Sequence, residues 1–379
     1  MKSKITPHKA TQQPSHRVLS IDALRGFIMI LMALDHANML LSKGSSSEFW
    51  GGPLPRSEDS LAFFTRFVTH LCAPGFFFLM GIGMVYFWHS RSERGWSLQQ
   101  IRHYFAKRGA LIVAIHFAMS ILFAIPSLIA GRFGIVYNVL YILGFSMIAA
   151  AWFLQMPISL LTFLCTGALL LPEFVLGEPS TFGTPVHPLM RLLTVPGYMG
   201  NSVVLYTFFP WFGLTLLGII SGRLMMKNHQ AFFRRLPLIS ASALGLFMAL
   251  RLLNVFGNLR PMEGTGWMAF LQLTKYPPSL TFMLMMIGVN LGLLYVLDKM
   301  PADMLKPQHP LLVFGRSALF FYVIHHFVFI AMMYAGLRNL PLRAMYPFWI
   351  LGVLITYPLC RRYAAFKHKK PAESLWHFF

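Results

Sequence analysis

The feature that most restricts how this 379-residue chain can fold is a series of ten apolar segments. Each segment is close to the length of a membrane-spanning helix. A helix that crosses a bilayer needs roughly 20 mostly apolar residues. The segments are Ala23–Leu41, Phe67–Trp88, Gly109–Ala130, Ile135–Leu154, Ile158–Leu171, Tyr206–Met226, Leu236–Phe256, Ser279–Leu297, Leu311–Ala335 and Tyr346–Tyr363. The fifth is the shortest, because Pro157 and Pro172 bracket it. The sequence therefore predicts an all-α, polytopic transmembrane helical bundle of about 10 spans.

The composition points to lipid as the main surroundings of the chain. Hydrophobic residues make up 56% and charged residues only 12%, which is too little polar surface for a water-soluble protein of this size. The net charge of +20 would suggest nucleic acid in a soluble protein, but here Lys and Arg gather in the short segments between apolar runs. Cys72, Cys165 and Cys360 show neither disulfide nor zinc-ligand spacing. We expect membrane lipid as a partner, and no nucleic acid.

The distribution of basic residues predicts the direction of the spans. With the N-terminus inside, the inner segments hold twenty Lys and Arg and the outer segments nine. Basic residues are enriched on the cytoplasmic side of membrane proteins. We therefore expect a cytoplasmic basic tail over residues 1–22, a transmembrane domain over 23–363 and a second cytoplasmic tail over 364–379.

Ionisable residues are few inside the predicted spans, and each is costly there without a partner, a water-filled cavity or a function. At the predicted cytoplasmic end of the first span, Asp22 and Arg25 are three residues apart, so they share a helical face and can pair. They either anchor the start of the helix or contribute to a site, and the two roles are compatible. Arg316 lies at a similar depth in the ninth span.

Asp35 and His36 lie in the outer half of the first span. A carboxylate beside an imidazole allows general-base chemistry near neutral pH. Because adjacent residues point about 100° apart on a helix, a direct bond between the two is not implied, and a polar clamp between helices stays open. His70, at the start of the second span, has a similar depth. It either converges with His36 on one outward-facing cavity or is an ordinary interfacial histidine.

The ninth span carries Tyr322, His325 and His326. Tyr322 and His326 are four residues apart and therefore share a face. Adjacent histidines on a regular helix point in different directions and are not expected to chelate one ion, so the sequence predicts no metal site.

Five motifs resemble a known family, the bacterial branch of the heparan-α-glucosaminide N-acetyltransferase catalytic family. They are Arg17–Asn38, Phe64–Gly83, Thr274–Gly288, Gly315–His326 and Tyr357–Lys370, in this order along the chain. The resemblance implies a transmembrane acyltransferase that passes an acyl group, typically acetyl from cytoplasmic acetyl-CoA, to an amino or hydroxyl group of a sugar on the far side. It also implies an integral, multi-pass protein of the bacterial cytoplasmic (inner) membrane, and it leaves a homo-oligomer open.

The resemblance assigns expected roles to the polar residues. Basic side chains would meet the phosphates of CoA, since guanidinium and ammonium groups bind phosphate well. These are Arg25, Arg316, Arg102, Lys107 and Arg108. A proton acceptor would activate the sugar for attack on the thioester, and the candidates are His36, Asp35 and His70. The remaining candidates, for binding the sugar, are His326, Tyr322, Lys275 and Tyr276.

One departure from the family pattern leaves the base open. In the animal lysosomal enzymes the catalytic histidine lies in the loop between the first two spans, and the corresponding stretch here, Ser42–Arg66, contains no histidine. Either His36 or His70 has taken that role, or this branch performs different chemistry. The main alternative function is a transporter or flippase for a small polar or glycan substrate. A transporter would more usually show inverted repeats or helix-breaking segments near the midplane, which the sequence does not show clearly.

Overall fold

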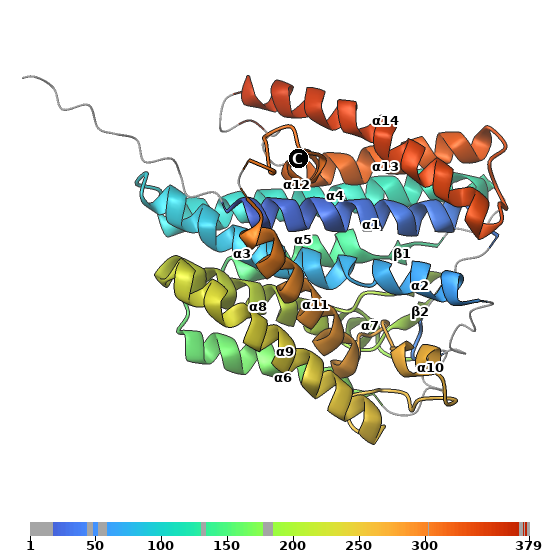
Figure 1. Cartoon of the computed structure of the whole chain (residues 1–379), viewed down its shortest axis with the longest axis horizontal. Helices are drawn as coiled ribbons and strands as arrows, with labels where there is room; N and C mark the ends of the chain where they lie inside the picture. The colour runs from blue at the N-terminus through green and yellow to red at the C-terminus, as the bar shows by residue number, and fades with distance from the viewer. Residues whose placement is uncertain are drawn as a thin grey trace, which may run out of the picture.

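Long helices lying side by side make up most of the computed structural model (Figure 1). It describes residues 18–43, 48–51, 59–129, 134–176, 185–301, 303–370, 374 and 376. Most of the predicted N-terminal tail and parts of the predicted C-terminal tail and of the loop Ser42–Arg66 lie outside these residues. The helices are α1 (Leu19–Leu41), α2 (Ser60–Thr69), α3 (Cys72–Ser92), α4 (Leu98–Ile129), α5 (Val139–Ala150), α6 (Ile158–Val175), α7 (Pro188–Leu193), α8 (Phe208–Lys227), α9 (His229–Leu253), α10 (Trp267–Leu271), α11 (Leu280–Lys299), α12 (Pro310–Arg316), α13 (Ala318–Tyr334) and α14 (Leu342–His368); the strands are β1 (Val136–Tyr137), β2 (Gly197–Met199) and β3 (Ser202–Val204).

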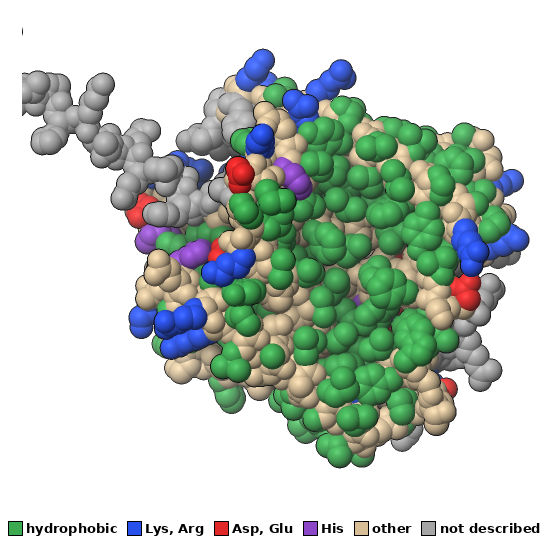
Figure 2. Space-filling view, viewed as in Figure 1, with side chains coloured by type: hydrophobic (Ala, Val, Ile, Leu, Met, Phe, Trp, Pro, Cys, Tyr) green, Lys and Arg blue, Asp and Glu red, His purple; other side chains and the backbone are tan. Residues whose placement is uncertain are grey.

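The predicted class, a polytopic membrane helical bundle, is confirmed. Within the described residues, 8 helical stretches are long and apolar enough to cross a membrane, or 9 if α12 and α13 count as one bent span. Helices α2 and α3 together form one such stretch, Ser60–Ser92. Hydrophobic side chains cover the middle of the face in Figure 2, while Lys and Arg gather toward its left and right ends. This pattern fits an apolar band surrounded by lipid.

The fourth predicted span, Ile135–Leu154, contains a much shorter helix than expected. Helix α5 has 12 residues and is preceded by β1. Strand β1 pairs with β3, which comes shortly before α8, while Arg223 near the other end of α8 donates a hydrogen bond to the carbonyl of Met156, beyond α5. Since α8 has 20 residues, or about 30 Å, α5 and the turn after it run along nearly the whole length of α8. The chain thus passes through the bundle here with only part of the segment helical.

The ninth predicted span, Leu311–Ala335, is broken, so the expectation of one continuous helix is wrong. Helix α12 ends at Arg316, α13 begins at Ala318, and their axes differ by 101°. Ser317 between them has φ −120° and ψ 32°, outside the helical region. Gly and Ser favour helices less than the apolar residues around them, which lowers the cost of a break at this point.

Two glycines let α12 pack directly against α1. A Cβ atom added to Gly26 would lie 1.8 Å from the carbonyl oxygen of Leu311, and one added to Gly315 would lie 1.9 Å from that of Asp22. Small residues allow this close approach between helices in membranes. The break after α12 follows this contact directly, so the chain changes direction once it has packed against α1.

Helix α1 is the central element for the candidate site. It contacts α2, α3, α11, α12, α13 and α14. It begins at the same end of the bundle at which α14 finishes, while the small sheet β1-β3-β2, α7 and α10 lie at the opposite end (Figure 1). Polar side chains on α1 can therefore meet other helices instead of lipid at either end of the bundle. The predicted sidedness, with the beginning of α1 in the cytoplasm, stays a prediction.

Candidate active site

The first polar group joins α1 to the break between α12 and α13. Asp22 Oδ1 lies 3.1 Å from Arg25 Nη1, and its Oδ2 lies 3.3 Å from Arg316 Nε. Arg25 Nη1 also donates to the carbonyl of Gly315. The Asp22 side chain is 6% exposed, while the two arginines are 24% and 26% exposed. Within this trio, which we call the inner group, two positive charges meet one negative charge.

The other predicted CoA-binding residues lie on α4 and have no printed contact with the inner group among the described residues. Arg102 lies over the ring of Trp152, 4.4 Å from its centroid. The Nε atoms of Arg102 and Arg108 are buried and have no hydrogen-bond partner among the described residues. Lys107 is exposed. These three side chains lie on a different helix from Arg25 and Arg316.

A second group, at the other end of α1, holds Asp35 in a network of charges. Arg66 Nη1 lies 2.6 Å from Asp35 Oδ1, and the Thr69 hydroxyl donates to the same oxygen at 3.0 Å. Arg66 also binds Glu48 through two parallel hydrogen bonds of 2.8 Å, from Nε to Oε1 and from Nη2 to Oε2. Such paired contacts between guanidinium and carboxylate are strong and fix the geometry of both groups. We call Asp35, Glu48, Arg66 and His70 the outer network.

His70 enters this network through Glu48. Its Nε2 atom lies 3.3 Å from Glu48 Oε1, although the approach does not have hydrogen-bond geometry, and neither ring nitrogen has a hydrogen-bond partner among the described residues. Burial alone would raise the pKa of the Glu48 carboxyl, but the charges of Arg66 and His70 outweigh burial and hold this pKa well below its ordinary value. Glu48 therefore stays ionised at neutral pH.

Asp35 and His36 turn to different helices, so the carboxylate does not orient the imidazole as the sequence allowed. Asp35 faces Arg66 and Thr69 of α2, while His36 faces α13. His70 packs against Glu48 and, at 5.5 Å between ring centroids, Phe282. The described contacts do not join His36 to His70 directly, and each has its own partners; whether the two share one outward-facing cavity stays a prediction.

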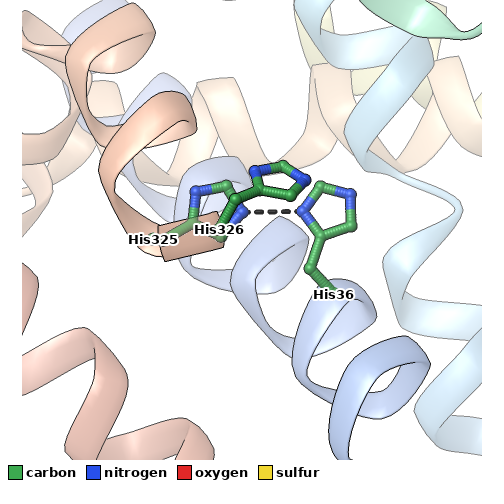
Figure 3. A group of neighbouring side chains, drawn as sticks. All are labelled: His36, His325 and His326. Carbon is green, nitrogen blue, oxygen red and sulfur yellow. Dashed lines mark hydrogen bonds between the residues drawn. The ribbon is translucent and has the colours of Figure 1, made fainter. Parts of the chain in front are cut away.

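Figure 3 shows His36 of α1 facing His325 and His326 of α13, a set that we call the histidine cluster. His36 Nδ1 lies 2.6 Å from His325 Nε2. The ring centroid of His326 lies 4.2 Å from that of His36 and 4.3 Å from that of His325. The α13 histidines are 1% and 5% exposed, and His36 is half-buried. Three imidazoles thus meet where two helices pack.

The hydrogen bonds of the histidine cluster determine its neutral tautomers. Nδ1 of His325 lies 2.7 Å from the carbonyl of Phe321, and Nδ1 of His326 lies 2.7 Å from that of Tyr322. A carbonyl only accepts, so both Nδ1 atoms carry the proton and both Nε2 atoms present a lone pair. His36 must then donate from Nδ1 to His325 Nε2, which leaves Nε2 of His36 unprotonated.

The geometric reason for expecting no metal site is wrong. The adjacent rings of His325 and His326 lie close together, and with His36 one ligand atom from each of the three lies within 4.8 Å of the others. The expectation compared only residues of one helix, whereas the third histidine comes from α1.

The predicted sugar-binding residues divide between the two groups at this end. Tyr322 belongs with the histidine cluster, since its ring centroid lies 5.9 Å from that of His36 and 4.8 Å from that of His326. The backbone N–H groups of Lys275 and Tyr276 both donate to the carbonyl of Glu48, and both side chains are buried. The Lys275 ammonium lies 5.3 Å from the centroid of the Tyr276 ring. This pair therefore belongs with the outer network.

Arg66 and Glu48 were not among the residues that sequence reasoning assigned to the site. Arg66 was counted among the basic residues of the outer loops, yet Arg66, Thr69 and His70 follow the spacing of residues that share a helical face, which is a detectable signal. Glu48 lies in a loop without a motif, so its contact with Arg66 depends on the folded chain. Acidic residues are rare in this chain, which has only 12 of them, and this rarity is a weaker signal for Glu48.

The fold and these groups define a multi-span helical membrane protein whose buried ionisable residues lie at both ends of its first helix. More specifically, the chain belongs to the heparan-alpha-glucosaminide N-acetyltransferase, catalytic family, whose model matches residues 17–256. The match includes all of α1, and with it His36, as well as the whole outer network. It ends before Lys275 and α13. Comparison with individually curated proteins gives no match. The family indicates a membrane acetyltransferase-like protein, and acetyl-CoA is the donor that this family uses.

Proposed function

We propose that this protein transfers an acetyl group from cytoplasmic acetyl-CoA to an amino or hydroxyl group of a sugar on the opposite side of the membrane. The observation that carries the proposal is the presence of two partly buried polar groups along one helix. Arg25 and His36 lie eleven positions apart on α1, or about 16 Å. Both contact the segment formed by α12 and α13. Arg25 donates to the carbonyl of Gly315, and His36 contacts His325. Ionisable residues inside a membrane bundle indicate function by default.

The inner group supplies the donor side of this proposal. Its two guanidinium groups, from Arg25 and Arg316, are both partly exposed. A phosphate of CoA would accept charge-assisted hydrogen bonds from them. Arg102 and Arg108 of α4, whose Nε atoms have no hydrogen-bond partner among the described residues, supply further positive charge for a second phosphate.

The histidine cluster supplies the acceptor side. The free lone pair of His36 Nε2 takes the proton from the sugar amine or hydroxyl, whose nitrogen or oxygen attacks the thioester carbonyl. A new N–C or O–C bond forms, the C–S bond breaks, and the CoA thiolate leaves and receives a proton. His325 orients His36 because its Nε2 atom accepts a hydrogen bond from Nδ1 of His36. His70, held beside the ionised Glu48, is the second candidate for the base.

The test uses purified protein in liposomes with an amino sugar enclosed and radiolabelled acetyl-CoA added outside. We expect label to accumulate in the enclosed sugar and free CoA to appear outside. His36→Ala should abolish both signals, while His116→Ala, which changes a buried histidine of α4 paired with Asn138, should retain them. Wild-type protein that releases no CoA with any enclosed amino or hydroxyl sugar would contradict the proposal.

The broken span favours a second candidate, a transporter. Discontinuous helices often hold the substrate near the middle of transporters, and α12 and α13 are bent by 101° at Ser317. In the same liposomes, labelled sugar that crosses the membrane at equal rates with and without acetyl-CoA would support transport. Sugar that is retained only in acetylated form would support the acetyltransferase.

A further inference from the structure

We propose that His36, His325 and His326 form a binding site for a divalent transition metal ion, with Zn²⁺ as the ion that suits it best. One nitrogen from each residue lies within 4.8 Å of the other two. Three imidazoles with an open fourth position are a known ligand set for zinc. This site is additional to acetyl transfer, and its existence does not depend on the function proposed above.

The hydrogen bonds around the cluster prepare two of the three ligands. Metal-binding histidines usually donate their other ring N–H to a carbonyl or carboxylate, which fixes the ring and directs the lone pair toward the metal. His325 and His326 both do this, since their Nδ1 atoms donate to the carbonyls of Phe321 and Tyr322. Each bond joins a residue to the carbonyl four positions earlier on α13, so the helix itself holds both rings.

The third ligand needs only a small movement. His36 Nδ1 and His325 Nε2 lie 2.6 Å apart because they share a proton. Two nitrogens bound to one tetrahedral zinc at about 2.0–2.1 Å lie roughly 3.3 Å apart. Replacing the proton by the ion therefore separates the two atoms by less than about 1 Å. The widest pair of ligand atoms, within 4.8 Å, must approach by up to about 1.5 Å to reach the same separation. His36 is half-buried and less enclosed than the α13 pair, so its ring has the most room to move.

The ligand set is neutral, and this decides which ion it favours. The nearest acid in sequence, Asp35, is bound by Arg66 and Thr69 of α2. Mg²⁺ and Ca²⁺ require oxygen ligands, which the cluster does not supply, whereas imidazole nitrogen suits zinc and its neighbours in the first transition row. An ion bound by three neutral imidazoles keeps its full charge and can bind water or an anion in its fourth position.

A bound metal and a proton-accepting His36 exclude one another. When Nδ1 of His36 binds the ion, the remaining proton of the neutral ring lies on Nε2, and no lone pair is left for the acceptor. If the acetyl transfer proposed above is correct, Zn²⁺ should therefore inhibit it, and a chelator should restore it. This consequence alone rests on the proposed function.

Binding is tested without any activity measurement. Chelator-treated protein, with any histidine tag removed, is titrated with Zn²⁺ in detergent by calorimetry, and retained metal is counted by mass spectrometry after desalting. We expect one tightly bound ion per chain. His36→Ala, His325→Ala and His326→Ala should each lower the affinity at least about tenfold. His116→Ala is the matched control and should bind as wild type does, since His116 lies on α4 beside Asn138.

Thermal unfolding of milder variants shows whether a loss of zinc binding reflects a loss of the fold. An ion that binds only the folded protein raises the unfolding temperature. We expect Zn²⁺ to raise it for wild type and His116→Ala and to leave it unchanged for His36→Gln and His326→Gln, which keep a polar side chain. Wild-type protein that retains no zinc, or equal zinc binding in His36→Gln and His326→Gln, would overturn the site and leave only a proton-sharing contact between α1 and α13. Tight binding without inhibition would contradict His36 as the base and leave the metal site intact.

Discussion

At the outer end of α1, two adjacent side chains serve two separate groups. Asp35 is held by Arg66 and Thr69, while His36 meets the histidines of α13. The carboxylate is neutralised within the outer network, so it is not available to raise the basicity of His36. The tautomer and orientation of His36 depend instead on His325, whose Nε2 accepts a hydrogen bond from Nδ1 of His36. Adjacent residues on a helix can thus take part in different chemistry because they point to different neighbours.

Substituting His36 is expected to separate chemistry from donor binding. His36→Ala removes the free Nε2 lone pair, so acetyl transfer should fall by at least about 10²-fold, the usual lower range for general-base catalysis. CoA binding should be unchanged, because the inner group lies about 16 Å away along α1. Single-turnover transfer and equilibrium CoA binding measure the two effects. Full transfer activity in this variant would move the base to His70.

Arg25 is expected to contribute to donor affinity. Arg25→Ala removes a guanidinium from the inner group and should weaken CoA binding by about 1 to 3 kcal/mol if it contacts a phosphate. Arg260→Ala is the control, since Arg260 pairs with Glu263 in a connection between helices away from this group. Calorimetry with CoA measures both. Equal affinity for both variants would assign Arg25 only to the packing of α1 against α12.

The outer network predicts a defined pH dependence of stability. Because Arg66 and His70 hold the pKa of Glu48 well below its ordinary 4.5, ionised Glu48 stabilises the folded protein above that pH, and the contribution is lost as the pH falls through the lowered pKa. The difference in unfolding temperature between wild type and Glu48→Gln should therefore stay constant from about pH 7 to about pH 5 and shrink only below that. A difference that already changes near pH 6 would indicate titration of His70 instead.

Sequence reasoning at this scale singled out the candidate residues but not their partners. Arg25, Asp22, His36 and His70 stand out because ionisable groups in apolar segments are rare. The contacts of Glu48 with Arg66, and of His36 with His325, join residues 18 and 289 positions apart, and local spacing carries no information about such pairs. The same limit left His36 out of the comparison of His325 with His326, because it lies on another helix.

At the scale of elements, the contact between α1 and α12 controls the geometry of the inner group. The backbones meet at Gly26 and Gly315, and the break at Ser317 follows at once. This arrangement brings Arg316 within reach of Asp22. A continuous helix over Leu311–Ala335 would carry Arg316 along a straight axis, so hydropathy, which predicted the length of this segment correctly, could not predict its bend.

A methyl group at Gly26 should disturb this contact. In Gly26→Ala the added Cβ would meet the Leu311 carbonyl, a backbone atom that cannot move aside freely, so we expect a loss of about 1 to 3 kcal/mol in stability. Gly167→Ala on α6 has open space around the new Cβ and should be neutral or slightly stabilising. Thermal unfolding in detergent compares the two. Equal stability would show that α1 and α12 can separate without cost.

At the scale of the whole molecule, apolar length predicted the architecture well. The helical bundle and the presence of a fifth span agree with the structure, although α6 continues past Pro172 to Val175. The short α5 and the sheet β1-β3-β2 were not expected, because a segment surrounded by other helices can leave the helical conformation where sheet partners satisfy its backbone groups.

The predicted sidedness can be tested with single cysteines. Lys43 after α1 and Arg94 after α3 are both exposed and lie at opposite ends of the bundle, and the three native cysteines are buried. A membrane-impermeant maleimide should label Lys43→Cys in intact cells whose outer envelope has been opened, and Arg94→Cys only after the membrane is permeabilised. The reverse pattern would place the inner group outside the cell and exclude cytoplasmic CoA as its ligand.

The separation of the two polar ends of α1 limits what kind of molecule can use both. A straight helix holds Arg25 and His36 about 16 Å apart and cannot shorten. A compact donor anchored at one end would leave its reactive carbon far from the other. Only a donor whose charged head and reactive tip are joined by a long, thin and flexible tether can touch both ends at once, unless α1 itself slides against its neighbours. The tight glycine contact with α12 opposes such sliding, so the reach of the ligand, more than motion of the protein, should decide which acyl carriers are accepted.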